Sequence, residues 1–141
     1  MIQRSERTWI ATGFLVVSIL VFTGLDFVIN SVLYSYGLKF DTAWFMLYSV
    51  GYLSLYQLIL GLIYFYTRSW KIPLLGEAFI LSGGVDLVFF GVWGRMQFPS
   101  GVWTWSGYAM FLGLHWTTAV QVIWAISVMS ATSIFALLKR K

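Results

Sequence analysis

The sequence predicts an all-α integral membrane protein, a four-helix transmembrane up-down bundle with both termini on the cytoplasmic side. Three observations carry this prediction: the composition, the length of four apolar stretches, and the distribution of basic residues between them. The 141 residues are 60% hydrophobic and only 10% charged, with a mean hydropathy of +0.81. Soluble domains are typically about 25% charged. Lipid is therefore the expected solvent over most of the surface, and the length fits one transmembrane domain over residues 1–141.

Four apolar stretches define the expected helices. They cover residues 9–29, 44–66, 73–93 and 108–138, with boundaries that are approximate. Each meets the roughly 20 residues that a helix needs to cross a ~30 Å hydrocarbon core. The first stretch is too long for the core of about 7–15 residues in a secretory signal, so we expect an uncleaved first helix. Short connections between the stretches favour antiparallel neighbours.

Basic residues set the expected orientation. Seven fall on one side of the predicted bundle, whereas only Lys39 and Arg95 fall on the other. Because Lys and Arg accumulate in cytoplasmic loops, we expect the termini and the 67–71 connection to face the cytoplasm of a plasma membrane-type bilayer. The seven residues on the cytoplasmic side are Arg4, Arg7, Arg68, Lys71, Lys139, Arg140 and Lys141.

The connection between the third and fourth helices, over residues 95–107, has its own signature. It contains Pro-Ser-Gly at 99–101, which is turn chemistry, followed by Trp103 and Trp105. Indole rings favour the boundary between membrane and water. We therefore expect an aromatic outer loop between helices 3 and 4.

The same composition limits partners and cofactors. The basic residues stand between apolar stretches, so the net charge of +4 indicates topology rather than a nucleic-acid surface. The expected partners are the lipid bilayer and other membrane subunits, or a second copy of the chain. The absence of cysteine excludes disulfides and thiolate metal sites. The sequence identifies no cofactor, and one histidine excludes a haem held by two imidazoles of this chain.

Three ionisable residues are predicted inside the outer half of the membrane. A rise of about 1.5 Å per residue places Asp86 ~20 Å from the inner side, His115 ~10 Å from the outer side, and Asp26 ~25 Å from the inner side. Such groups are costly in hydrocarbon and suggest a functional site. Asp26, Asp86 and His115 are thus candidate ligand- or ion-binding residues, and a metal, if one binds, would use His115 and Asp86. A structural Asp86–His115 pair and a solvated or capping Asp26 stay open as alternatives.

Four further residues are expected to serve helix packing. Gly84 and Gly91 share one face of the predicted third helix, where small residues let a neighbouring helix approach closely. Gln57 and Gln121 lie in the second and fourth helices at similar depths, ~20 Å from the outer side. We expect both side chains to form hydrogen bonds between helices.

These features favour a non-catalytic subunit of a larger membrane protein complex, packed against partner helices and lipid. The glycine face, the short tails and an aromatic content of 20% are the supporting observations. The alternative is a self-contained membrane protein that binds an ion, a proton or a hydrophobic ligand at the outer-half Asp/His site. That alternative includes a small membrane enzyme, although the sequence has no nucleophile motif, phosphate-binding loop or HExxH motif.

Overall fold

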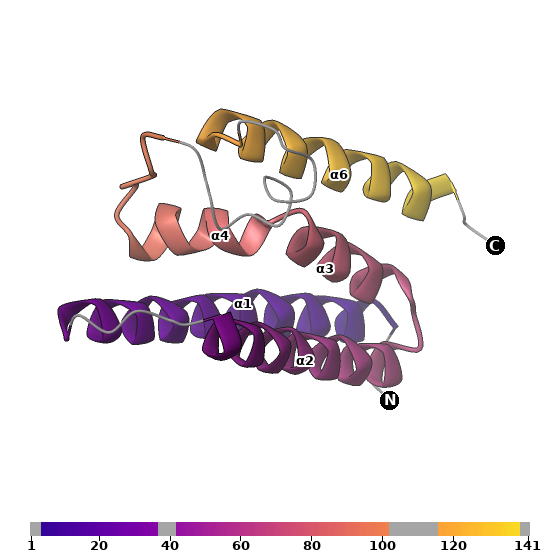
Figure 1. The fold of residues 1–141 in the computed structure, drawn as a ribbon. Coiled ribbons are helices and arrows are strands. Elements are labelled where there is room, and N and C mark those ends of the chain that lie inside the picture. The colour runs from indigo at the N-terminus through magenta and orange to yellow at the C-terminus, as the bar shows by residue number, and fades with distance from the viewer. Residues whose placement is uncertain (1–3, 37–41, 102–115, 139–141) are drawn as a thin grey trace. The chain divides into compact units, whose positions relative to one another are not determined.

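The computed structural model describes residues 4–36, 42–101 and 116–138, and helices are the only regular elements in these ranges (Figure 1). This confirms the all-α prediction for the part of the chain that is described. The helices are α1 (Arg4–Ser35), α2 (Thr42–Thr67), α3 (Lys71–Leu81), α4 (Gly84–Val88), the π-helix η1 (Phe89–Trp93) and α6 (Thr118–Leu138).

Three of these helices are long and apolar enough to cross a membrane. The qualifying stretches are Ser5–Leu33, Val50–Thr67 and Thr118–Leu138, with mean hydropathies of 2.2, 1.3 and 1.8. A helix that is apolar on all sides must be buried in protein or in lipid. The three helices therefore indicate an integral membrane protein, and α3 together with α4 and η1 supplies a candidate fourth span.

The third expected helix is broken, which corrects the prediction of one helix over 73–93. Helix α3 ends at Leu81, α4 begins at Gly84, and the two pieces are bent by 72° at the break. Gly83 lies between them with a φ of +74°, a left-handed conformation that costs glycine little and other residues more. Its main-chain N–H donates to the oxygen of Ile80 at 3.0 Å and closes the end of α3.

The other helix boundaries also differ from prediction. Helix α1 extends beyond the expected range 9–29 at both ends. Helix α6 begins at Thr118, and residues 108–115 of the expected fourth helix lie outside the described residues. The predicted aromatic loop is described only as far as residue 101. Its two tryptophans and the candidate His115 lie outside the described residues.

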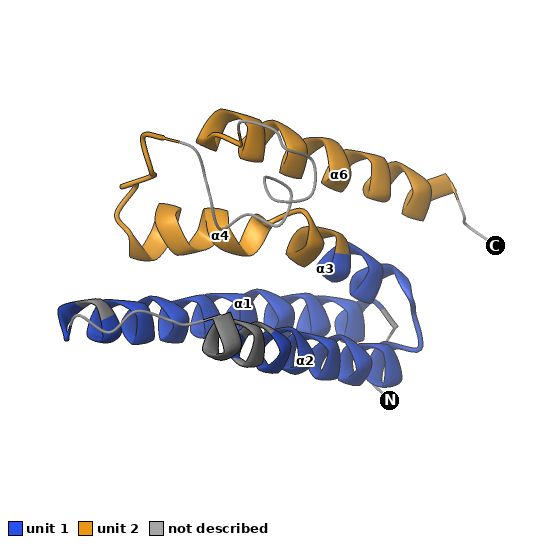
Figure 2. Ribbon diagram, in the orientation of Figure 1, with its two compact units in different colours: residues 1–77 blue, residues 78–141 orange. Residues whose placement is uncertain are grey.

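The chain divides into two compact units, residues 1–77 and residues 78–141 (Figure 2). In the first unit α1 and α2 lie side by side. The Arg7 guanidinium lies over the Tyr66 ring, 5.9 Å from its centroid, while Asp26 contacts Tyr48. The start of α1 thus meets the end of α2, and the two helices run antiparallel.

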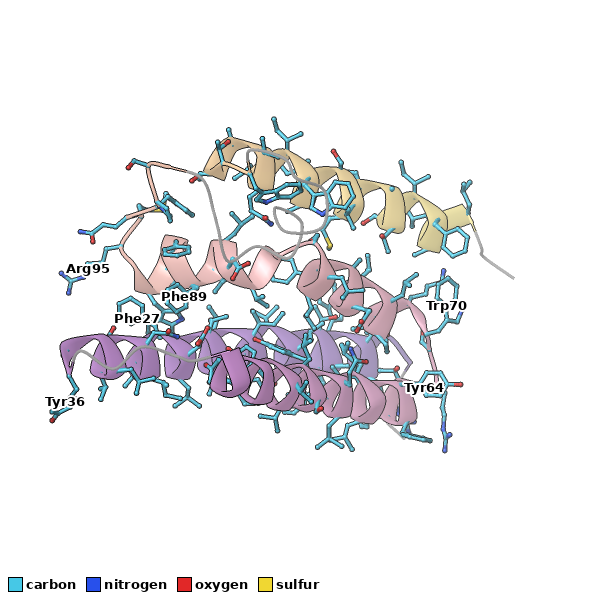
Figure 3. The ribbon with its side chains drawn as sticks, in the orientation of Figure 1. Phe27, Tyr36, Tyr64, Trp70, Phe89 and Arg95 are labelled. Atoms are coloured by element: carbon cyan, nitrogen blue, oxygen red, sulfur yellow. The ribbon has the colours of Figure 1, made fainter. Side chains whose placement is uncertain are left out.

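Close packing in the first unit depends on Gly76 in α3. A Cβ atom at this position would lie 2.6 Å from Cδ2 of Leu60 and 3.1 Å from Cδ2 of Leu15. The missing side chain therefore lets α3 approach α1 and α2, as small residues do in membrane bundles. Aromatic residues stand at helix ends in the same unit, with Tyr36 at the end of α1 and Trp70 beside the start of α3 (Figure 3). Such positions suit the membrane interface.

Candidate functional site

Asp26 is half-buried in α1 and accepts two hydrogen bonds on one carboxylate oxygen, Oδ1. The Tyr48 hydroxyl of α2 donates one, and Nδ2 of Asn30 donates the other at 2.7 Å. Asn30 also donates to the main-chain oxygen of Asp26 at 2.9 Å, because residues four apart share a helix face. A carboxylate can accept about four hydrogen bonds. Among the described residues, no side chain donates to Oδ2, so Asp26 keeps accepting capacity.

An aromatic row extends from this carboxylate along α2. The Tyr48 and Tyr52 rings are stacked with centroids 5.6 Å apart, and Tyr52 meets Tyr56 edge to face at 5.2 Å. Phe22 of α1 packs edge to face on Tyr56 at 5.5 Å. Tyr56 is fully buried. The row fixes the register between α1 and α2 and so positions the Tyr48 hydroxyl against Asp26.

Asp86 lies in the first turn of α4 and is half-buried. Its main-chain N–H donates to the oxygen of Gly83 at 3.1 Å. Asp86 belongs to the unit of residues 78–141, whereas Asp26 belongs to the other unit. The structure therefore brings Asp26 together with Tyr48 and Asn30, and the grouping of Asp26, Asp86 and His115 stays a prediction. Within the described ranges, no group of three His, Cys, Asp or Glu residues could hold a metal ion.

The side chain of Gln121 in α6 is 1% exposed, and both the nitrogen and the oxygen of its carboxamide form hydrogen bonds. Its Nε2 donates to the main-chain oxygen of Ser82 at 2.5 Å, and its Oε1 accepts from Nε1 of Trp116 at 2.6 Å. Ser82 stands at the break after α3, where a helix leaves main-chain oxygens without intrahelical donors. Gln121 therefore joins α6 to the connection between α3 and α4.

Gln57 of α2 has a different partner. It is exposed, and its Nε2 donates to Oε2 of Glu77 in α3 at 2.6 Å. Both residues belong to the first unit. Gln57 thus joins α2 to α3 through this hydrogen bond. Its acceptor is an acidic residue that sequence reasoning had assigned no role.

The glycines at 84 and 91 differ from each other in their surroundings. A Cβ atom at Gly84 would lie 2.5 Å from the Phe79 ring of the preceding helix. At Gly91 it would meet only Phe98 at 3.5 Å and Met96 at 3.9 Å, which are ordinary contacts. Packing of either glycine against a further helix stays a prediction.

Comparisons with known proteins found no matching protein-family model, no matching curated protein and no matching solved structure. Function must therefore be inferred from the residues of this chain. Two arrangements in the first unit carry chemistry: the Asp26–Tyr48–Asn30 cluster and the Gln57–Glu77 pair. The first could bind a proton or a cation, and the second offers polar atoms on an exposed helix face.

Proposed function

We propose that this protein is a non-catalytic subunit of a larger membrane complex, in which partner helices and lipid cover its spans. The single observation behind the proposal is how little of each span is covered by the chain itself. In the three candidate spans, only 17%, 28% and 17% of the most apolar stretch is buried within the molecule.

The uncovered surface is formed by large apolar side chains. Ile123 of α6 is 65% exposed, and Phe65 and Leu58 of α2 are 64% and 61% exposed. Association of helices in a membrane is driven by van der Waals packing and interhelical hydrogen bonds rather than by the hydrophobic effect. A helix that makes few such contacts within its own chain has most of its surface available for partner helices.

The proposed topology is four up-down crossings, with α3, α4 and η1 as one bent span, and both termini on the cytoplasmic side of a plasma membrane-type bilayer. The contact of Arg7 with Tyr66 supports this orientation. It brings the start of α1 to the end of α2, where Arg68 and Lys71 follow. Basic residues from two separate parts of the sequence thus gather at one end of the first unit, as expected at a cytoplasmic surface.

The test is purification of the tagged full-length chain from its native membranes in a mild detergent. The proposal expects larger membrane proteins to co-purify in a fixed stoichiometry and to remain bound through a second column. A chain that purifies alone, or only with copies of itself, would contradict it.

A second candidate function is binding of an ion, a proton or a hydrophobic ligand by a self-contained protein. The Asp26 cluster favours it, because a carboxylate inside a span is costly unless it is used or paired. Asp26→Asn, Asp86→Asn and His115→Ala test this candidate. Loss of bound metal or of ligand binding in any of them, in a chain that needs no partner, would support it over the subunit proposal.

A further inference from the structure

The Gln57–Glu77 pair lies at hydrocarbon depth. Glu77 is six positions after Lys71, the start of α3, which corresponds to ~9 Å along the helix. Gln57 is ten positions before Thr67, the end of α2, which corresponds to ~15 Å. With the 67–71 connection at the membrane surface, both side chains lie within a ~30 Å hydrocarbon core.

The Gln57–Glu77 pair is accessible from outside the chain, and part of its hydrogen-bonding capacity is unused. Gln57 is exposed and Glu77 is half-buried. Their one mutual hydrogen bond uses Nε2 of Gln57 and Oε2 of Glu77. Among the described residues, no Lys, Arg or His side chain pairs with Glu77, and its Oε1 accepts no hydrogen bond. A lipid-facing carboxylate in this state is costly, which is why such groups normally face a partner.

The helix surface around the pair is suited to close approach. Ser54 and Gly61 lie three positions before and four positions after Gln57, on the same face of α2. A Cβ atom at Gly61 would meet nothing within 4 Å. The Ser54 hydroxyl donates to the main-chain oxygen of Val50 at 2.7 Å and so turns back onto its own helix. A neighbouring backbone can therefore come near enough to reach Glu77.

Charge determines the kind of partner. The Lys and Arg residues that the structure describes, at positions 4, 7, 68, 71 and 95, lie near helix ends or in connections, and none of them falls at the depth of Glu77. The remaining four, at 39 and 139–141, fall outside the four apolar stretches of the sequence. A second copy of the chain therefore has no cation to offer at this depth. We propose that the face formed by Gln57, Glu77, Ser54 and Gly61 docks a transmembrane helix of a different protein, which carries a Lys or Arg side chain opposite Glu77. This inference rests on the proposed subunit function and names the contact that such a complex would use.

The test uses the full-length chain in lipid nanodiscs and synthetic apolar helices of about 20 residues. The helices are identical except for a central Lys, Leu or Glu, and association is measured by energy transfer between dyes. The wild-type chain is expected to bind the Lys helix about tenfold more tightly than the Leu helix, an effect of the size seen for polar contacts between model helices. The preference is expected to disappear in Glu77→Gln and to survive in Glu6→Gln, which removes the same charge at the exposed start of α1.

A charge-reversal variant distinguishes loss of the contact from poor folding of the chain. Glu77→Lys is expected to lose binding of the Lys helix and to gain a preference for the Glu helix, which a misfolded chain would not do. Equal binding of Lys and Leu helices to the wild-type chain, or a Lys preference that persists in Glu77→Gln, overturns the proposal. Self-association of the wild-type chain that depends on Glu77 also overturns it, because the occupant would then be a second copy.

Purification from native membranes separates this inference from the subunit proposal. If wild type co-purifies with partners and Glu77→Lys does not, both stand. If both chains retain the same partners, the complex exists but the contact lies elsewhere, and only the inference fails. If wild type has no partners, the subunit proposal fails, whatever the synthetic helices show.

Discussion

Gln121 donates a 2.5 Å hydrogen bond to the main-chain oxygen of Ser82, at the break between α3 and α4. The acceptor is one that a continuous helix would have used itself, and a helix break in a membrane is tolerated where other groups satisfy the freed main-chain atoms. Trp116 completes the arrangement by donating to the carboxamide oxygen of Gln121, which fixes the amide with its nitrogen toward Ser82. The bend and its partner in α6 are therefore one structural feature.

Gln121→Leu should lower the free energy of unfolding. It removes the acceptor of Trp116 and the donor to Ser82 while keeping a similar side-chain volume, and stranded buried polar groups cost about 1–3 kcal/mol each in water-soluble proteins. In membrane proteins these costs fall toward the lower end of that range, so Gln121→Leu is expected to lower the free energy of unfolding by about 1–2 kcal/mol. Unfolding in mixed detergent micelles measures it. Ser127→Ala is the control, because that exposed hydroxyl bonds only its own helix, at the oxygen of Ile123. An equal loss of stability in Gln121→Leu and Ser127→Ala would contradict the stabilising role of the Gln121 hydrogen bonds.

Gly83→Ala should be destabilising for two reasons that can be separated. An alanine at this left-handed φ costs about 1–2 kcal/mol, and its Cβ would lie 2.3 Å from Nε2 of Gln121. Combined with Gln121→Ala, the substitution should cost less than it does alone, since the steric conflict is gone. A double-mutant cycle measures the difference, and strict additivity would contradict the contact. Gly13→Ala serves as the control, because its Cβ would meet nothing within 4 Å.

Asp26 and Tyr48 should show coupled effects on stability. Tyr48→Phe removes one donor to the carboxylate, and Asp26→Leu removes the acceptor of both Tyr48 and Asn30. Each variant should lower the free energy of unfolding by about 0.5–1.5 kcal/mol. Because both remove the same hydrogen bond, the double variant should lose less than the sum. Independent losses would show that the hydroxyl and the carboxylate do not interact.

Surface labelling tests the proposed orientation and whether the bent pair crosses the membrane. The chain has no cysteine, so a single introduced thiol gives an unambiguous signal. A membrane-impermeant maleimide applied to intact cells should label Ser100→Cys and should leave Ser5→Cys unlabelled until the cells are permeabilised. Both positions are exposed. Labelling of the two from the same side would mean that α3, α4 and η1 turn back without crossing.

Length and apolar content were sufficient to predict α1, α2 and α6, because a membrane span is a strong signal in a single sequence. The break at Gly83 was missed although Ser-Gly-Gly at residues 82–84 carries turn chemistry. The sequence predicts Gly84 to be a packing residue within a helix and assigns no role to Gly83. A residue that needs a left-handed φ and a residue that allows close approach are both glycines, so sequence alone does not separate the two roles.

The hydrogen-bond partners of Gln57, Gln121 and Asp26 could not be predicted from the sequence either. Helical depth predicts that Gln57 and Gln121 form hydrogen bonds between helices. In the structure Gln57 of α2 donates to Glu77 of α3, and Gln121 of α6 donates to Ser82 in the connection between α3 and α4. The depth of a residue does not determine how its helix is rotated relative to its neighbours, so the acceptors of the two hydrogen bonds could not be predicted. Asn30 lies four residues after Asp26 on the same face of α1, but the contact of Tyr48 from α2 with Asp26 depends on the register of the two helices, which only the folded chain defines.

Native mass spectrometry of the chain, purified from membranes in mild detergent by a tag that is then cleaved off, tests the subunit proposal most directly. One copy has a mass of 16.1 kDa. The proposal predicts a dominant particle whose mass exceeds that of one chain by the masses of other membrane proteins, and which releases the 16.1 kDa chain on activation. A dominant particle at 16.1 kDa, or at a whole-number multiple of it with no other protein present, would contradict the proposal.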